Sequence, residues 1–273
     1  MDALSARAAS RRLAEILGIA RQAGRVSVED LAQRFAVTPQ TIRRDLNELC
    51  EARVLTRVHG GAMIASGIEN LAYEARKAVA ALHKRLIGAA AAALVPGHSS
   101  LFINIGTTTE AVARALGGHA GLLVITNNLH VAGELYRNPA IEVVLAGGVI
   151  RHSDGGIIGP GTVEQIRQFR VDTAVVGTSA IDADGTLLDF DIREVQVSQA
   201  IIASARRVML VADSSKFLRS APVRIAHLSD INVLVTDRLP SPEIAALCAA
   251  NEVEVVEAGG PVEADELSDE SSF

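Results

Sequence analysis

This chain of 273 residues has no tryptophan, and only 3% of its residues are aromatic. It has no apolar run of about 18 residues, the length that a membrane-spanning helix needs. No continuous apolar segment follows the first charged residues, so a secretory signal peptide is not expected. These absences predict a cytoplasmic protein that does not enter a membrane, and the length predicts two domains.

Two cysteines, Cys50 and Cys248, fit no disulfide framework and no metal-binding spacing. The seven histidines are scattered, with no H-x-x-x-H motif, so no zinc site is expected. The P-loop pattern G-x-x-x-x-G-K-[ST] is also missing. The sequence therefore predicts no metal and no cofactor.

The net charge of −6 argues against a wholly basic nucleic-acid binder, but the charge is unevenly distributed. Residues 1–65 hold ten Arg, no Lys and seven acids, a net charge of +3, which leaves −9 for the remainder. A basic front on an acidic body is typical of a DNA-binding head joined to a regulatory domain.

Residues 38–46, T-P-Q-T-I-R-R-D-L, read as the start of a helix built to enter a DNA groove. Thr38 suits the N-cap, Pro39 suits the first helical position, and Ile42 and Leu46 share an inward face. The remaining surface holds donors that contact phosphates and purine edges: Gln40, Thr41, Arg43, Arg44 and Asn47. The alternative is a solvated helix with an ordinary charge pair.

The flanking segments favour the DNA-binding interpretation. Ser10–Ala23 has a helical apolar face, Ser27 caps a second helix, and Ala36-Val37 makes a tight turn. Residues 54–64 alternate around Gly60-Gly61, which predicts a β-hairpin, or wing, after the third helix. A plain edge hairpin is the alternative. The predicted DNA-contacting residues are Ser27, Thr38, Gln40, Thr41, Arg43, Arg44, Asn47, Arg57 and His59.

The arginine-led first helix, then T-P-Q-T-I-R-R-D-L and R-V-H-G-G-A, resemble the winged helix-turn-helix head of DeoR-type bacterial transcriptional repressors. One departure is Ala20, where that family usually has a larger aliphatic residue. The resemblance implies that the chain binds double-stranded operator DNA.

Beyond residue 84, apolar strands alternate with helices, which predicts a mostly parallel α/β sheet covered on both faces. The low aromatic and high alanine content agrees with this class. Predicted strands are Leu101–Ile105, Leu122–Thr126, Ile141–Ala146, Thr173–Gly177, Val208–Ala212, Ile231–Thr236 and Val253–Val256. Predicted helices are Lys84–Ala93, Glu110–Leu116, Leu129–Tyr136, Val163–Phe169, Glu194–Ala205 and Pro242–Ala250.

Ligands of open parallel sheets bind beyond the carboxyl ends of the strands. After the first strand, Gly106 and a threonine run form a candidate anion cradle at a helix start, or merely a capped helix. Later strands end in amides, glycines, a carboxylate and a lysine, whose alternatives are caps, turns and solvated charges. Convergence of such groups indicates a small polar phosphorylated ligand. The predicted effector-binding residues are Gly106, Thr107, Thr108, Thr109, Asn127, Asn128, Gly147, Gly148, Asp189 and Lys216.

The body, from D-G-G-I-I-G through I-D-A-D-G-T-L-L-D-F-D to V-A-D-S-S-K-F, resembles the effector domain of the same family, whose fold is similar to sugar-phosphate isomerases. The resemblance implies that Gly106–Thr109 hold a phosphate near Lys216. It also implies release from DNA by an inducer, glycerol 3-phosphate or another sugar phosphate, and a homo-oligomer, dimer or tetramer.

An isomerase with a fused head is the rival class. Carboxylates for a general base are present after the fourth strand, but isomerases of this fold carry D-G-A-D-E and K-G-x-G-G loops, whereas this chain has I-D-A-D-G and S-K-F-L-R. The sequence therefore predicts a regulator and no enzyme. The expected divisions are a winged-helix head (1–65), a linker helix (66–83), an effector domain (84–260) and a disordered acidic tail (261–273).

Overall fold

The computed structural model describes residues 12–13, 15–20, 25–51, 55–58, 60–64, 73–78 and 80–258. The chain forms two compact units, Met1–Arg76 and Lys77–Phe273, called the head and the body below. Among the described residues, no helix has the length and apolar character needed to cross a bilayer. The predicted disordered tail, 261–273, lies outside them.

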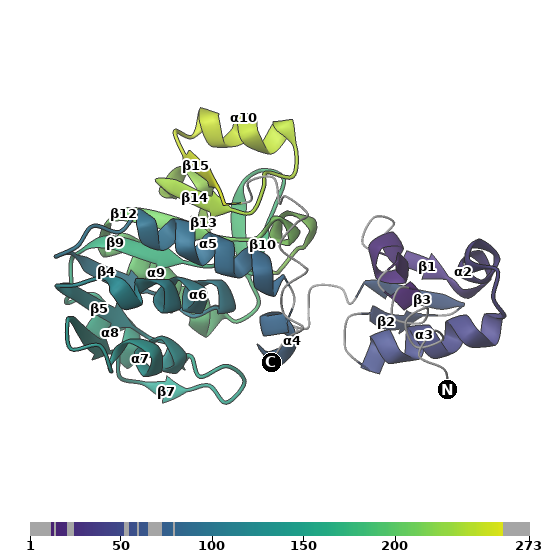
Figure 1. The fold of residues 1–273 in the computed structure, drawn as a ribbon, viewed down its shortest axis with the longest axis horizontal. Coiled ribbons are helices and arrows are strands. Elements are labelled where there is room, and N and C mark those ends of the chain that lie inside the picture. The colour runs from purple at the N-terminus through teal and green to yellow at the C-terminus, as the bar shows by residue number, and fades with distance from the viewer. Residues whose placement is uncertain are drawn as a thin grey trace, which may run out of the picture. The chain divides into compact units, whose positions relative to one another are not determined.

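The head is a small helical unit closed by a three-stranded sheet (Figure 1). Helical residues 15–20 precede β1 (Arg25–Ser27), α2 (Val28–Phe35), α3 (Pro39–Glu51), β2 (Leu55–Val58) and β3 (Gly61–Ile64). The two helices and the helical segment bury a common core that includes Ile16, Ala20, Leu31, Ile42 and Leu46. The predicted winged helix-turn-helix is therefore confirmed, and the small Ala20 lies inside its core.

Strand β1 was not predicted, because three residues between two helices carry too little periodicity to indicate a strand. It pairs antiparallel with β3, so that the sheet order is β1-β3-β2. Gly61 permits this pairing: a Cβ at that position would lie 2.0 Å from the Val26 carbonyl oxygen. The second wing glycine is thus needed for close backbone approach, whereas Gly60 supplies the turn with φ of 77°.

The body is built on a seven-stranded sheet whose neighbouring strands are all parallel, as predicted (Figure 1). Its strands are β4 (Ser100–Ile103), β5 (Leu122–Thr126), β6 (Ile141–Leu145), β9 (Val171–Val176), β12 (Ala205–Val211), β14 (Val233–Thr236) and β15 (Glu254–Glu257). Its helices are α5 (Ala81–Ala93), α6 (Thr107–Ala115), α7 (Leu129–Leu135), α8 (Pro160–Ile166), α9 (Ile192–Ala203) and α10 (Pro242–Ala250).

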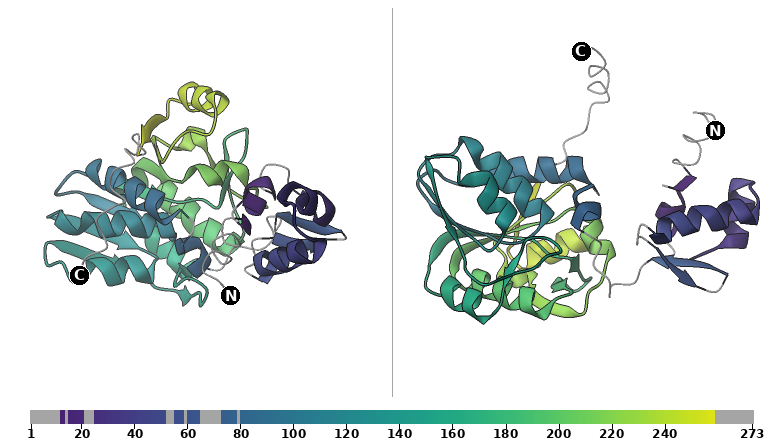
Figure 2. Two further views of the ribbon diagram at one scale, coloured as in Figure 1. Left: turned by 45° about the vertical axis from the view of Figure 1, so that its right-hand side comes forward. Right: turned by 90° about the horizontal axis from the view of Figure 1, so that it is seen from below.

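Helices cover both faces of this sheet, as the view from below in Figure 2 shows. Leu101 and Ile103 of β4 lie in a core with α5, α6 and α7. Phe102, between them, lies in the opposite core with α8, α9 and α10. Burial on both faces explains why the strands read as unbroken apolar runs instead of alternating patterns.

The strand order is β15-β14-β12-β9-β4-β5-β6. Along the chain, β5 and β6 are added on one side of β4, whereas β9 lies on its other side and is followed outward by β12, β14 and β15. The reversal lies between β4 and β9, and their carboxyl ends form the place where such sheets bind ligands.

The body also contains short strands outside the seven-stranded sheet, which were not predicted. Strands β7 (Val149–Ile150) and β8 (Ile157–Ile158) form a hairpin, and β10 (Ala180–Ile181), β11 (Thr186–Asp189) and β13 (Val223–His227) form an antiparallel sheet. Within the predicted linker helix, 66–83, lies α4 (Tyr73–Ala78), and α5 already begins at Ala81 instead of Lys84. The two-residue strands β7, β8 and β10 are too short for an apolar pattern to be read from sequence.

Helices α5 and α6 flank β4 in the chain and run side by side in the same direction over one face of the sheet (Figure 1). They meet at Gly88, where a Cβ would lie 2.6 Å from the backbone carbon and oxygen of Ala111. Glycine at this position therefore sets both the distance and the register between the two helices.

Replacing Gly88 with alanine should destabilise the body by about 1–3 kcal/mol, because the new methyl group forces the two helices apart. Denaturant unfolding followed by circular dichroism measures this change. The control is Gly133→Ala in α7, where no atom lies within 4 Å. The control should gain roughly 0.5–1 kcal/mol from helix propensity. Equal stabilisation of both variants would contradict the close-packing argument.

Candidate functional sites

The outer face of α3 carries the side chains predicted to contact DNA. Ile42 and Leu46 are fully buried, which leaves Gln40, Arg43, Arg44 and Asn47 exposed on the other side of the helix. Thr38 caps the helix as predicted: its hydroxyl accepts the Thr41 N–H at 3.2 Å and lies 2.9 Å from the Thr41 hydroxyl. The two threonines thus hold the helix start.

The other predicted DNA-contacting residues flank α3. Ser27 caps α2, where its hydroxyl accepts the Asp30 N–H at 3.0 Å. Ala36, in the left-handed conformation with φ of 50°, ends that helix and makes the predicted turn. Arg57 is exposed on β2, while His59 lies outside the described residues.

The acid of the R-R-D run turns away from the two arginines. Asp45 is buried and pairs with Arg12, whose Nε and Nη2 donate to its two oxygens at 2.5 and 3.1 Å. This bidentate pair ties the first helical segment to α3. It also removes the carboxylate from the surface, so that Arg43 and Arg44 keep their positive charge on the outer face.

In the body, Gly106 and the threonine run lie after β4, at the reversal point of the sheet. Gly106 has φ of 145° and precedes α6, which begins at Thr107. A Cβ on Gly177, the residue after β9, would lie 3.7 Å from both the Ile105 carbonyl oxygen and the Thr109 methyl group. The two loop ends therefore meet, and the first-turn amides of α6 provide the donors of an anion cradle.

The threonine hydroxyls contribute unequally to this cradle. Thr109 is fully buried, and its Oγ1 donates to the carbonyl oxygens of Asn104 and Gly106, both at 2.7 Å. Its hydroxyl thus shapes the loop, so the candidate donors to a ligand are the amide groups and the hydroxyls of Thr107 and Thr108. Asn104 itself is buried and donates to the Ser198 hydroxyl on α9 at 2.8 Å.

The two asparagines after β5 differ in their roles. Asn128 caps α7 through the His130 N–H at 2.9 Å and donates to Glu110 Oε1 at 3.3 Å, so both ends of its amide are used. Asn127 donates to the Ile157 carbonyl oxygen at 3.1 Å, but its buried Oδ1 has no hydrogen-bond donor among the residues that the structure describes. A buried acceptor without a donor at this edge fits a ligand that brings a hydroxyl group.

Gly147 and Gly148 follow β6, two strands away from β4, and pack against α8. The Gly147 N–H donates to Gln165 Oε1 at 2.7 Å, and a Cβ on Gly148 would lie 2.1 Å from the Thr162 hydroxyl.

The last two predicted effector-binding residues lie on other elements. Asp189, at the end of β11, is buried and accepts from the Ser179 hydroxyl at 3.0 Å. Lys216 lies in the 3₁₀ turn Ser214–Leu218 after β12, beside Asp213.

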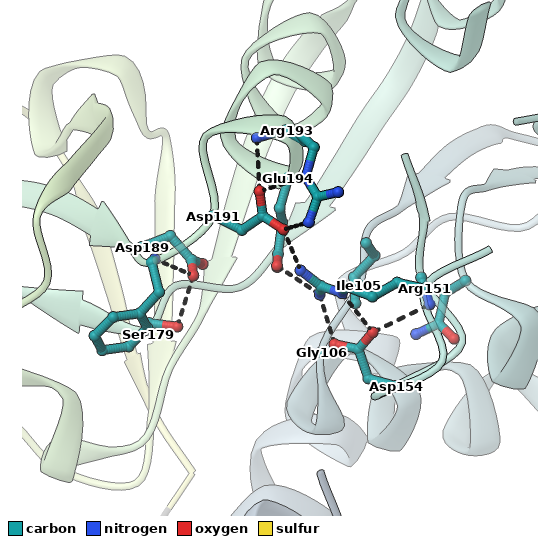
Figure 3. Close-up of polar contacts among 12 residues, drawn as sticks. Ile105, Gly106, Arg151, Asp154, Ser179, Asp189, Asp191, Arg193 and Glu194 are labelled. Atoms are coloured by element: carbon teal, nitrogen blue, oxygen red, sulfur yellow. Dashed lines mark hydrogen bonds and ion pairs between the residues drawn. The ribbon is translucent and has the colours of Figure 1, made fainter. Parts of the chain in front are cut away.

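Sequence reasoning missed a charged cluster beside this site (Figure 3). Arg151, from the loop after β7, donates to Asp154 at 2.8 and 2.6 Å and lies 3.4 Å from Asp191 Oδ2. Glu194 Oε2 lies 2.6 Å from Arg151 Nη2 as an ion pair that lacks hydrogen-bond alignment. The i, i+3 spacing of Arg151 and Asp154 was the available signal, but nothing in the sequence places α9 beside them.

The carboxylates of this cluster have opposite pKa shifts. Hydrogen bonds from Arg193 hold the pKa of Asp191 down to about 2. Burial, followed by the charge of Asp189, raises the pKa of Glu194 to about 7, and Arg151 only partly offsets this. Near neutral pH, a proton on Glu194 therefore relieves the excess of negative charge.

Comparison with known proteins decides the family. A family model described as DeoR-like helix-turn-helix domain matches residues 12–67, and one described as DeoR C terminal sensor domain matches residues 80–238. The chain belongs to the DeoR family. The resemblance read from the sequence is thus confirmed.

Relatives within the DeoR family extend over most of the chain. The glycerol-3-phosphate regulon repressor of Haemophilus influenzae is 51% identical over 231 residues, covering 85% of this chain and 90% of that one. Its Escherichia coli K12 counterpart is 44% identical and covers 88% and 95%. The Escherichia coli repressor CsqR is 39% identical and covers 89% and 93%. This DeoR-family chain is a DNA-binding transcriptional repressor, and its relatives are not enzymes.

Among solved structures, ribose 5 phosphate isomerase A from Neisseria gonorrhoeae aligns with a TM-score of 0.37 and 16% identity, covering 50% of this chain and 53% of that one. Translation factor eIF2B beta from Chaetomium thermophilum gives a TM-score of 0.44 and 15% identity, covering 63% and 54%. Nothing about the chemistry of this repressor follows from likeness at that level.

Removing Arg12 should destabilise the head of this DeoR-family protein. Arg12→Ala leaves Asp45 buried without its cation, at a cost of about 2–4 kcal/mol for a partly buried pair. Hydrogen–deuterium exchange of the α3 amides measures the loss as faster exchange. Arg44→Ala, an exposed position on the same helix, is the control and should change protection by less than about 0.5 kcal/mol. Equal exchange rates in the two variants would remove the pair from the stabilising interactions.

The raised pKa of Glu194 predicts a pH-dependent stability. The unfolded chain ionises this group near pH 4.5 and the folded chain near 7, so its favourable contribution is present below 4.5 and is lost as pH rises to 7. Glu194→Gln does not titrate, so its stability relative to the unchanged protein should rise over that window by on the order of 3 kcal/mol.

Urea unfolding of the body at a series of pH values tests this expectation. Glu164→Gln is the control, since that carboxylate is exposed on α8 and pairs with exposed Arg167. Its stability difference should stay flat with pH. A flat difference for Glu194→Gln as well would show that this carboxyl titrates normally in the folded protein.

Proposed function

We propose that this repressor grips operator DNA through the outer face of α3 and the β2–β3 hairpin, and that glycerol 3-phosphate releases it. The identity of the inducer rests on one observation: relatives at 44–51% identity over most of the chain are named for the glycerol-3-phosphate regulon. The alternative is another sugar phosphate, because CsqR, at 39% identity, carries a different name.

The geometry of the head supports the proposed DNA contacts. Exposed guanidinium and amide groups on one helix face suit the major groove, and Arg57 on the hairpin suits a phosphate or the minor groove. A two-fold homo-oligomer, dimer or tetramer, would present two heads to two half-sites. We place this complex in the cytoplasm, where operator DNA is found.

The geometry of the body supports a phosphate ester as the inducer. Anion donors at the start of α6 lie at the same sheet edge as Lys216, and the orphan Asn127 Oδ1 suits a ligand hydroxyl. Induction is then a shift between two states of the repressor. The inducer must bind the low-affinity state more tightly, because a ligand with equal affinity for both states shifts nothing.

Arg43→Ala should weaken operator binding. If Arg43 grips a phosphate, the affinity falls for all sequences and the slope of log K against log[salt] drops by about 1. If it reads a base, discrimination at one operator position falls by about 1–3 kcal/mol. Fluorescence anisotropy with operator variants at several salt concentrations separates these outcomes. Glu48→Gln, exposed on the same helix, is the control, and unchanged binding by Arg43→Ala would remove this residue from the interface.

Glycerol 3-phosphate should release the protein from operator DNA, whereas glycerol should not. A panel of phosphate esters, tested by thermal shift and by operator anisotropy, identifies the inducer, since a ligand that binds the folded state raises its melting temperature. Lys216→Met should keep operator affinity and lose at least tenfold in inducer sensitivity. Release by glycerol alone, or by no phosphate ester, would contradict the proposed function.

A further inference from the structure

The two edges of the seven-stranded sheet differ in how they are protected. One edge is β15, which begins and ends with the exposed residues Glu254 and Glu257, and Arg207 donates to Glu254 at 2.9 Å. The other edge is β6, at the opposite margin of the body with β7 (Figure 1). It carries an uncharged stretch, Val143–Ile150, which runs from β6 into β7 and is called the apolar edge below. Because charged residues keep an edge strand from pairing with another chain, β15 is protected and β6 is not.

We propose that the apolar edge is the surface through which two copies of this repressor associate. The partner is a second copy of the chain, related to the first by a two-fold axis. This inference rests on the two-fold homo-oligomer of the proposed function and specifies the surface that forms it.

Large apolar side chains are exposed along the apolar edge. Among the described residues, seven large apolar side chains are exposed, and three of them lie within six positions of each other. They are Leu145, Val149 and Ile150, with exposed fractions of 39, 67 and 48%. Single exposed apolar residues are ordinary, but a group of them is typical of an interaction surface. Within the described part of the chain, β6 pairs only with β5 and β7 only with β8, so main-chain groups at this edge are also left for a partner.

The fold holds the end of the apolar edge in place. Ile157 and Ile158 of β8 are buried, and the Ile157 N–H donates to the Asn127 carbonyl oxygen at 2.7 Å, which fixes the inner strand of the hairpin to the body. Arg151, directly after β7, forms an ion pair with Glu194 on α9, which fixes the outer strand. The exposed side chains of β7 are therefore presented by an ordered hairpin, and a partner binds them at a small cost in conformational entropy.

Charge and symmetry favour a second copy as the partner. Residues 66–273 carry a net charge of −9, so two bodies repel each other except where their surfaces carry no charge. An open strand edge is also complementary to itself, because a two-fold axis places it antiparallel to its own copy with main-chain donors opposite main-chain acceptors. An uncharged surface, in contrast, offers no cations to the phosphates of a nucleic acid or of a lipid. A second copy also brings the second head that two operator half-sites need.

Val149→Glu should dissociate the oligomer, because each copy would bring a carboxylate against an apolar and acidic partner. Leu218→Glu is the control, since Leu218 is also 67% exposed but lies in the 3₁₀ turn after β12. Sedimentation velocity of the full-length proteins, without DNA or ligand, measures the change. The control should sediment like the unchanged protein, whereas Val149→Glu should have half the mass or less and a self-association Kd at least tenfold higher. An unchanged mass for Val149→Glu, or equal dissociation of both variants, would overturn the inference.

Cross-linking adds a test that does not depend on weakening the oligomer. Val149→Cys should join two chains through a short bis-maleimide, whereas Leu218→Cys should stay at the background that the natural Cys50 and Cys248 set. Cross-linking of Leu218→Cys alone would place the contact elsewhere and overturn the inference. If the unchanged protein sediments as a monomer at micromolar concentration, the two-fold assembly of the proposed function fails together with this inference. An oligomer that the Val149 substitutions neither dissociate nor cross-link would remove the apolar edge alone.

Discussion

The reversal of strand order between β4 and β9 is the constraint on which the body depends. Two parallel strands that lead into crossovers on opposite sides leave a gap at their carboxyl ends that no connection covers. The loops that follow Ile103 and Val176 lie close together there, since a Cβ on Gly177 would lie 3.7 Å from the Ile105 carbonyl oxygen. Gly106, with φ of 145°, makes the turn into α6. The proposed effector site is thus a property of the topology before it is a property of any side chain.

Charged side chains lie in two groups around this gap. On the α5 side, the charges of Lys216 and Lys84 help to lower the pKa of Asp213. On the α9 side, Arg151 faces Asp154, Asp191 and Glu194, with Asp189 close to Glu194. The surplus of acid on this second side is tolerable because burial keeps a proton on Glu194 up to near neutral pH.

Whether an element of the fold could be predicted depended on how many residues its sequence pattern spans. The recognition stretch Thr38–Leu46 and all seven parallel strands were predicted, because capping, helical periodicity and buried apolar runs are local properties. The accessory strands β1, β7 and β10 were missed, since two or three residues carry no period. Arg151 and Glu194 were missed as a cluster for a different reason. They meet only because the fold brings α9 beside the loop after β7, and no local sequence pattern indicates that contact.

The two faces of α3 have different roles. The inner face stabilises the head through the burial of Ile42 and Leu46 and through the ion pair of Asp45 with Arg12. The other face carries Gln40, Arg43, Arg44 and Asn47, whose side chains are exposed. If these four residues contact the operator as proposed, substitutions among them change which DNA sequence is bound at little cost to the stability of the head. Duplicated copies of such a repressor could then come to control different genes while keeping the same head and the same effector ligand.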